Sequence, residues 1–374
     1  MRVNKLLFFI VLIPLFFISF YNAVPAEKLS IIVGIGNDLN PENSKKYSAT
    51  FEILSDRSNS HLSSIPLTGS DLTLYTSENE RQMENSKKWL WAEVIYILSE
   101  DRARLGIEDL VDSFIRDTSR NERAYIIVSK QDSKTVFSIP TPPSYSVSEH
   151  INGIIKNLNE SNFYSNRYEV IDLMLMESQN GRNIVLPYIE IEDNKPKVNG
   201  LALFEGNQMI KYVPLDEAKL INLLRNKNGE GFLSILSDNP QQYIDLKGKS
   251  SSKVKVSLEE DKLKYDIFIN MKGYILVNSL KNSYGYFDDT RVIEKTLEDK
   301  VKNMLLDEIN LIQNNYRFDC LDLTRYAIAK FGDTSPYISK ENFLNSKIDV
   351  HVNVKILSGG KSIDPDSGTK LFKK

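Results

Sequence analysis

The residues whose spacing could support phosphate chemistry lie early in the chain, where an apolar run reaches Gly34 and Gly36. A dinucleotide-binding loop needs three glycines, for a tight turn, for close approach of the backbone to the phosphates and for helix packing. Leu39 stands where the third glycine is required, and Pro41 interrupts any following helix. No acidic residue follows at the end of a second strand, about 20 positions on. We therefore expect the end of a strand here, not a phosphate-binding loop.

Two short motifs are typical of penicillin-recognising enzymes. Ser250 and Lys253 fit the S-x-x-K pattern, and residues 237–239 read S-D-N. Their order is reversed relative to those enzymes, and no K-T-G motif follows. We interpret both as coincidences in a Ser- and Lys-rich part of the chain. The sequence also lacks the G-x-S-x-G motif of α/β-hydrolases and the H-E-x-x-H motif of zinc proteases.

Metal and thiol chemistry have little support. The three histidines, His61, His150 and His351, show no spacing that suggests a metal site, so we expect solvated or structural roles. The single cysteine, Cys320, cannot form an internal disulfide and lies between apolar residues, which favours a packed thiol over a nucleophile. From these residues the best-supported class is an exported binding or assembly module.

Composition narrows the function classes further. The chain has 374 residues, 41% of them hydrophobic, which predicts two or three domains with a real core. Its net charge of −3 lacks the basic excess that nucleic-acid binding normally requires.

The N-terminus is typical of an exported protein. Arg2 and Lys5 precede an uncharged, apolar run over residues 6–26. Basic residues followed by an apolar core describe an export signal. The run is also as long as the roughly 20 residues needed to cross a bilayer. Both cleavage after Ala26 and retention as a membrane anchor therefore remain open.

Beyond this segment the sequence predicts alternating strands and helices, and hence sheets covered by helices. We expect Asn180-Gly181 to form the turn of a hairpin between strands at residues 172–177 and 184–191. Residues 55–64 and 247–253 read as polar connections. The other predicted strands are 29–35, 47–54, 72–76, 89–99, 124–129, 200–204, 208–213, 253–258, 264–272 and 348–356, and the predicted helices are 77–90, 107–116, 149–158, 216–224 and 290–316.

Three stretches, in order along the chain, are similar to one known family. The first is AEKLSIIVGIGND at residues 26–38. The second begins at Val198 and places Gly200, Phe204 and Glu217 at the family's positions. The third is the long helix ending in YRFDCLDLTRYAIAKF, with Asp319, followed by IDVHVNVKI. Together they make the chain resemble the C subunits of bacterial spore germinant receptors.

The resemblance implies a non-enzymatic protein without a cofactor. Such C subunits lie on the outer face of the inner spore membrane and act with an A-type and a transporter-like B-type membrane subunit in sensing nutrients. The family's lipid-modified cysteine has no counterpart in FYNAVPAEKL at residues 20–29. Because thioether attachment of diacylglycerol needs a thiol, we expect anchoring through residues 6–26, or release after Ala26, but no lipidation.

The expected fold is α+β, multi-domain and exported, with mixed and antiparallel sheets packed by helices and a long amphipathic helix near the C-terminus. We divide the chain into a signal or anchor (1–26), an N-terminal α/β domain (27–145), a middle domain (146–246), a C-terminal domain (247–358) and a polar tail (359–374).

The residues Gly200, Phe204, Glu217 and Asp319 are expected to contact partner subunits or to serve the fold. For Phe204 the alternative is core packing, because it alternates with Gly200 on one strand face. For Glu217 the alternative is stabilisation of a helix start, where a carboxylate meets the positive end of the dipole. Two other functions stay open: an exported solute-binding protein and, with less support, a cell-wall hydrolase.

Overall fold

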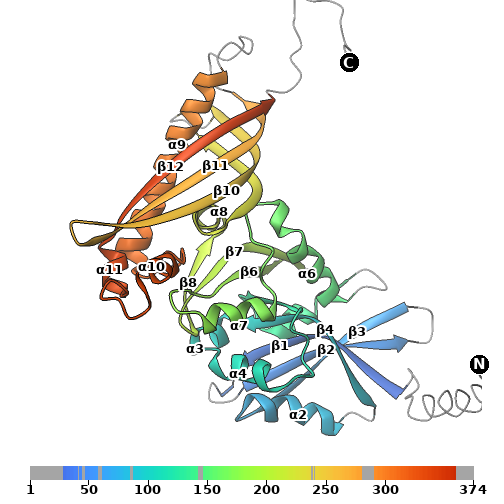
Figure 1. The fold of residues 1–374 in the computed structure, drawn as a ribbon. Helices are drawn as coiled ribbons and strands as arrows, with labels where there is room; N and C mark the ends of the chain where they lie inside the picture. The colour runs from blue at the N-terminus through green and yellow to red at the C-terminus, as the bar shows by residue number, and fades with distance from the viewer. Residues whose placement is uncertain are drawn as a thin grey trace, which may run out of the picture.

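The computed structural model describes residues 28–40, 42–43, 47–57, 61–84, 87–141, 146–236, 239, 241–279 and 290–358. Its chain forms an eight-stranded sheet and a four-stranded sheet, each packed by helices (Figure 1). The expected α+β class with mixed sheets is therefore confirmed. The expected signal or anchor (1–26) and the polar tail (359–374) lie outside the described residues. Among the described helices, none has the length and hydropathy that crossing a membrane requires.

The eight-stranded sheet has the order β3-β2-β1-β4-β5-β6-β7-β8, in which β1, β4, β5 and β6 run parallel. β-Branched, apolar runs suit such central strands because both faces are buried. The strands are β1 (Leu29–Leu39), β2 (Tyr47–Arg57), β3 (His61–Asp71), β4 (Lys88–Ser99), β5 (Tyr125–Ser129), β6 (Val185–Glu192), β7 (Lys195–Glu205) and β8 (Gln208–Pro214).

Helices cover both faces of this sheet. On β4, Ile95 and Ile97 enter one apolar core while Tyr96 and Leu98 enter another, as the two-residue period of a strand requires. α5 and α6 contribute to the first core, and α4 and α7 to the second. The helices are α2 (Leu74–Glu84), α3 (Glu100–Leu105), α4 (Glu108–Arg116), α5 (Ser133–Phe137), α6 (Val147–Lys156), η2 (Leu158–Glu160), α7 (Val170–Ser178) and α8 (Leu215–Arg225).

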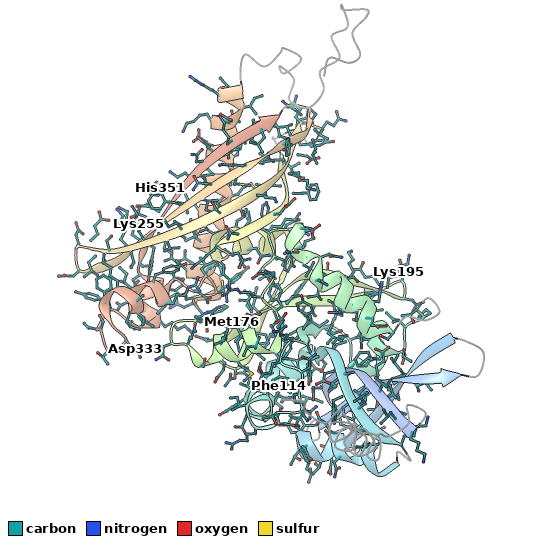
Figure 2. All side chains as sticks on the ribbon, turned by 45° about the vertical axis from the view of Figure 1, so that its right-hand side comes forward. Phe114, Met176, Lys195, Lys255, Asp333 and His351 are labelled. Carbon is teal, nitrogen blue, oxygen red and sulfur yellow. The ribbon has the colours of Figure 1, made fainter. Side chains whose placement is uncertain are left out.

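The four-stranded sheet has the order β12-β11-β10-β9 and is crossed on one face by the long helix α9 (Figure 1). Lys255 and His351 lie on this sheet (Figure 2). The ring of Phe268 stacks with His351 and lies under the Lys255 ammonium group. The elements are β9 (Asn228–Leu236), β10 (Tyr243–Glu259), β11 (Lys262–Asn278), α9 (Thr290–Leu311), the π-helical turn η4 (Ile312–Tyr316), α10 (Thr324–Phe331), α11 (Lys340–Leu344) and β12 (Lys347–Ser358).

The long helix confirms the prediction from periodicity. Leu297, Val301, Leu305, Ile309 and Ile312 form its buried stripe. Val292, which the same spacing placed on that stripe, is 58% exposed, so the packed part of the helix begins later than predicted.

Several local predictions are wrong, among them the hairpin at Asn180-Gly181 and the end of the helix expected at 77–90, since α2 ends at Glu84 and β4 begins at Lys88. Residues 172–177 belong to helix α7, and residues 247–253 lie inside strand β10. Residues 72–76 are not a strand, because β3 ends at Asp71 and α2 begins at Leu74. The loop predicted at 55–64 is largely strand, since β2 runs to Arg57 and β3 starts at His61.

The glycines of the opening motif also lie elsewhere than predicted. Gly34 and Gly36 are inside β1, next to a bulge, and not at its end. A Cβ on Gly34 would lie 1.9 Å from the Ser148 Oγ, and one on Gly36 would lie 1.9 Å from the Ser133 Cβ. The glycines therefore let α6 and α5 approach the strand closely.

The expected division into domains stays a proposal, and the sheets bear on two of its boundaries. The boundary at 145/146 lies between β5 and β6, which are neighbours in one sheet. The boundary at 246/247 lies inside β10. Along the chain, the elements of the eight-stranded sheet end with α8 at Arg225, and those of the four-stranded sheet begin with β9 at Asn228.

Candidate functional site

The loop between η4 and α10 carries Asp319 and Asp322. It lies where the two sheet regions meet, that is, the eight-stranded sheet with its helices and the four-stranded sheet with its helices. The carboxylate of Asp319 accepts hydrogen bonds from the backbone amides of Leu321 (3.1 Å) and Thr324 (2.7 Å), and from the Thr324 hydroxyl (2.7 Å). These bonds satisfy donors at the start of α10, as a cap does. Burial raises the pKa of Asp319, and the hydrogen bonds from Thr324 oppose that effect. The side chain of Asp319 is thus hydrogen-bonded within its own loop.

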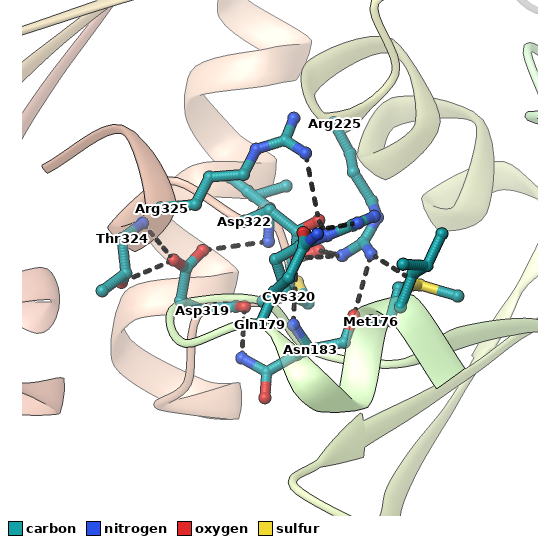
Figure 3. Close-up of polar contacts among 12 residues, drawn as sticks. Met176, Gln179, Asn183, Arg225, Asp319, Cys320, Asp322, Thr324 and Arg325 are labelled. Carbon is teal, nitrogen blue, oxygen red and sulfur yellow. Dashed lines mark hydrogen bonds and ion pairs between the residues drawn. The ribbon is translucent and has the colours of Figure 1, made fainter. Parts of the chain in front are cut away.

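Asp322 is the centre of a buried ion-pair cluster (Figure 3). Its carboxylate lies 2.8 Å from Arg225, 3.3 Å from Arg182 and 3.9 Å from Arg325. It also accepts a hydrogen bond of 3.0 Å from the backbone amide of Asn183. We call these residues, with Asp319, the junction cluster. One aspartate here faces three guanidinium groups.

Arg225 ties three segments of the chain together (Figure 3). It ends helix α8 and donates to the backbone oxygens of Cys320 (2.7 Å) and Asn183 (2.8 Å). It also approaches the Met176 sulfur at 3.5 Å. Since a buried guanidinium must have its donors satisfied, this residue fixes α7, α8 and the 319–322 loop relative to one another.

The junction cluster has no activated nucleophile. Cys320 lies beside it but is fully buried, and this burial, with the neighbouring Asp319, raises the thiol pKa well above its ordinary value. A protonated, inaccessible thiol is not reactive. Among the described residues, no group of three His, Cys, Asp or Glu side chains is arranged to hold a metal ion.

Gly200 and Phe204 lie on β7 and are both buried. The Phe204 side chain is fully buried in the sheet's core. A Cβ on Gly200 would lie 1.9 Å from the Val213 carbonyl oxygen on β8, so the position requires glycine. The Gly200 carbonyl accepts a 2.8 Å hydrogen bond from Tyr164. Both residues are therefore packed inside the eight-stranded sheet region.

Glu217 lies half-buried in the first turn of α8 and accepts a hydrogen bond from the Tyr316 hydroxyl at the end of η4. Glu217 is one of two acidic residues in this first turn, where the predicted interaction with the helix dipole requires it, and no side-chain cap hydrogen bond forms at the start of α8. Near it, Glu308 is 4% exposed, and burial together with the Glu217 charge raises the pKa of Glu308 to about 7. Glu217 thus joins α8 to the end of the long helix.

A second buried polar group lies at the carboxyl end of β1. Asp38 accepts hydrogen bonds from the backbone amide (3.0 Å) and hydroxyl (2.9 Å) of Ser133. Near the ends of β1 and β5, the side-chain amide of Asn37 and the hydroxyl of Ser129 are buried without a described partner. We call Asn37, Asp38, Ser129 and Ser133 the sheet cluster. Burial raises the pKa of Asp38 to about 7.

Sequence reasoning found Asp319 but missed Asp322, Arg182 and Arg225. These residues are up to 140 positions apart, so no local spacing connects them. The sequence did carry one signal, a second aspartate three residues after Asp319 in an otherwise apolar loop. Once that aspartate is buried, its carboxylate needs a cationic partner.

Comparisons with known proteins bear on the same two regions. Residues 22–191 match the model of the spore germination protein N-terminal domain. Residues 199–360 match the model described as spore germination B3/GerAC like, C-terminal. The two matches leave only the residues between 191 and 199 uncovered within 22–360.

Individual relatives agree with these models. The putative spore germination protein YfkR of Bacillus subtilis (strain 168) is 22% identical over 227 residues. That match covers 58% of this chain and 58% of YfkR, so the chain spans under two thirds of the curated relative. The crystal structure of the GerBC protein superposes with a TM-score of 0.54 at 15% identity, covering 87% of this chain and 97% of GerBC, which supports the fold. The chain belongs to the GerAC-like family of spore germination proteins.

Proposed function

We propose that this chain is a non-enzymatic subunit of a membrane-associated germinant receptor that acts by assembly with A- and B-type membrane subunits. The observation that carries the proposal is the pair of family matches, one in each sheet region. In this proposal the protein is exported and lies on the outer face of the inner spore membrane. Residues 1–26 hold it there if they are not cleaved.

The geometry of the junction cluster favours a structural role over catalysis. Its carboxylates accept hydrogen bonds from backbone amides or pair with arginines, so neither is placed as a general base. Its thiol is buried. Groups arranged in this way hold segments of a protein in fixed positions, which suits a subunit whose surfaces contact partners.

The direct test is co-purification. An affinity tag on the full chain should recover A- and B-type subunits from solubilised membranes of dormant spores. Deleting the gene should abolish germination in response to one nutrient and leave germination by other routes intact. Recovery of the chain without either subunit, together with normal germination of the deletion strain, would contradict the proposal.

Glu217 offers a sharper test, because it is the one candidate residue whose side chain is partly accessible. We expect Glu217→Ala to weaken recovery of the partner subunits while the protein still accumulates. Glu341→Ala is the matched control, since Glu341 is also an acidic residue in the first turn of a helix, α11, and is exposed. Equal recovery from both variants would remove Glu217 from the contact surface.

A further inference from the structure

A cavity of about 420 Å³ opens beside the junction cluster, between the two sheet regions. Its walls come from α7, the end of α8, the start of β9 and the loop that carries Asp322. This volume lies within the range of small-molecule sites, roughly 300 to 1,000 Å³. We call it the junction cavity.

The walls of the junction cavity carry a surplus of positive charge. Five cationic side chains line it, and only two carboxylates, those of Asp172 and Asp322, do so. Five minus two leaves a formal charge of +3, in a chain whose net charge is −3. The cationic residues are Arg167, Arg182, Arg225, Lys227 and Arg325.

Asp322 does not neutralise this surplus. Its two oxygens are shared by Arg225, Arg182 and Arg325, and its side chain is only 2% exposed. Burial lowers the pKa of Arg182, and the positive charges of Arg225 and Arg325 add to that effect, while Asp322 opposes it. Repulsion among the guanidinium groups therefore persists in the folded chain.

Two of the five cationic side chains are accessible to a ligand that enters the cavity. Arg167 precedes α7 and Lys227 follows α8, and both are exposed. Neither side chain forms an ion pair or hydrogen bond with another residue in the described part of the chain. Asparagine side chains, which can donate hydrogen bonds, also line the cavity, at Asn166 and Asn228 among others.

We propose that the junction cavity binds a small molecule through a carboxylate or phosphate group. Guanidinium groups recognise both oxyanions with paired, charge-assisted hydrogen bonds, and an added negative charge would relieve the repulsion around Asp322. Because Arg167 belongs to one sheet region and Arg325 to the other, the bound anion would also stabilise the contact between them. This inference does not depend on assembly with other subunits.

The test uses the full chain, purified in mild detergent, with inorganic phosphate and acetate as separate probes and calorimetry as the readout. Ionic strength is held constant with sodium chloride, which screens charges without offering an oxyanion. We expect at least one probe to bind and to raise the melting temperature above that in chloride alone.

Variants at the two exposed cations make the test specific. Arg167→Ala and Lys227→Ala should each weaken binding by about fivefold, because each removes one partly solvated charge. Arg167→Lys should recover part of the loss, since it keeps the charge but not the planar donor pair. Lys302→Ala, at an exposed position on α9 outside the cavity, is the matched control and should bind as the original chain does.

The outcomes separate the alternatives. Binding of phosphate but not acetate, or the reverse, identifies the oxyanion class and supports the proposal. Absence of heat and of any melting shift with both probes would overturn it. Equal effects of the Arg167, Lys227 and Lys302 substitutions would also overturn it, because binding would then follow overall charge and not this cavity.

Discussion

Asp38 in the sheet cluster and Asp322 in the junction cluster are buried to a similar extent, at 3% and 1% exposed, but their neighbours differ in charge. Asp38 receives hydrogen bonds from Ser133 and has no ion pair with any described residue. Asp322 lies among three arginines. A buried carboxylate is stabilised by a proton, by hydrogen-bond donors or by a cation, and these two regions use different solutions.

The difference teaches where each region is vulnerable. The charge of Asp38 depends on pH near neutrality, because burial raises its pKa to about 7. The stability of the region around Asp322 depends on its single carboxylate, since removing that anion leaves several buried cations facing each other. The first region should therefore respond to pH and the second to substitution.

The largest expected effect tests the charge count at the junction. Asp322→Asn keeps the side-chain shape and tolerates the left-handed backbone at this position, where φ is 57°, but removes the anion. Since Arg225 and Arg182 are then left unpaired, the free energy of unfolding should fall by about 3 kcal/mol. Urea unfolding measures it. Asp216→Asn is the control, because that side chain is 96% exposed and should change stability by less than about 0.5 kcal/mol.

The next effect tests packing around the sheet cluster. Gly36→Ala would bring a Cβ within 1.9 Å of the Ser133 Cβ, displacing the residue that donates to Asp38, and should cost about 1–3 kcal/mol. Gly153→Ala is the matched control. No atom lies within 4 Å of its added Cβ, and alanine favours helix α6, so stability should rise by up to about 1 kcal/mol. Equal destabilisation by both changes would refute the close-approach argument.

The pH dependence tests the protonation of Asp38. Its folded pKa of about 7 lies above its ordinary value of 3.8, so the folded state binds more protons than the unfolded state between those pH values. Its contribution to stability is therefore present below pH 4 and is lost as pH rises to about 7. Asp38→Asn abolishes this loss because asparagine does not titrate. Relative to the original chain, the free energy of unfolding of the variant should therefore rise by more than about 1 kcal/mol between pH 4 and pH 7.5. Parallel pH profiles for the two proteins would show that Asp38 is ionised throughout.

Local patterns predicted the elements that have a clear period. The stripe of α9 and the alternation of β12 follow directly from spacing. β10 was missed at residues 247–253 because its inward positions carry Gly248 and Ser250, which are small or polar and hide the alternation. α7 was read as a strand because Asn180-Gly181 suggested a hairpin, although Val170, Leu173 and Met176 give helical spacing.

The candidate site was less predictable, for a physical reason. Asp319 acts through residues within five positions of it, and that local loop is visible in the sequence. The partners of Asp322 come from two other helices and a turn, so only the folded chain brings them together. Sequence alone shows that a buried charge requires a partner but cannot say which of 47 lysines and arginines supplies it.

The smallest expected effect separates the three arginines around Asp322. Arg325 lies 3.9 Å from the carboxylate and is 27% exposed, whereas Arg225 lies 2.8 Å away and is 8% exposed. Solvent screens the more distant and more exposed pair, so Arg325→Gln should cost less than about 1 kcal/mol. Combining it with Asp322→Asn completes a double-mutant cycle, in which the coupling between the two positions should be equally small. A larger coupling would mean that Asp322 balances all three arginines as one unit, although the formal charge of the cavity lining, five cations minus two carboxylates, would still be +3.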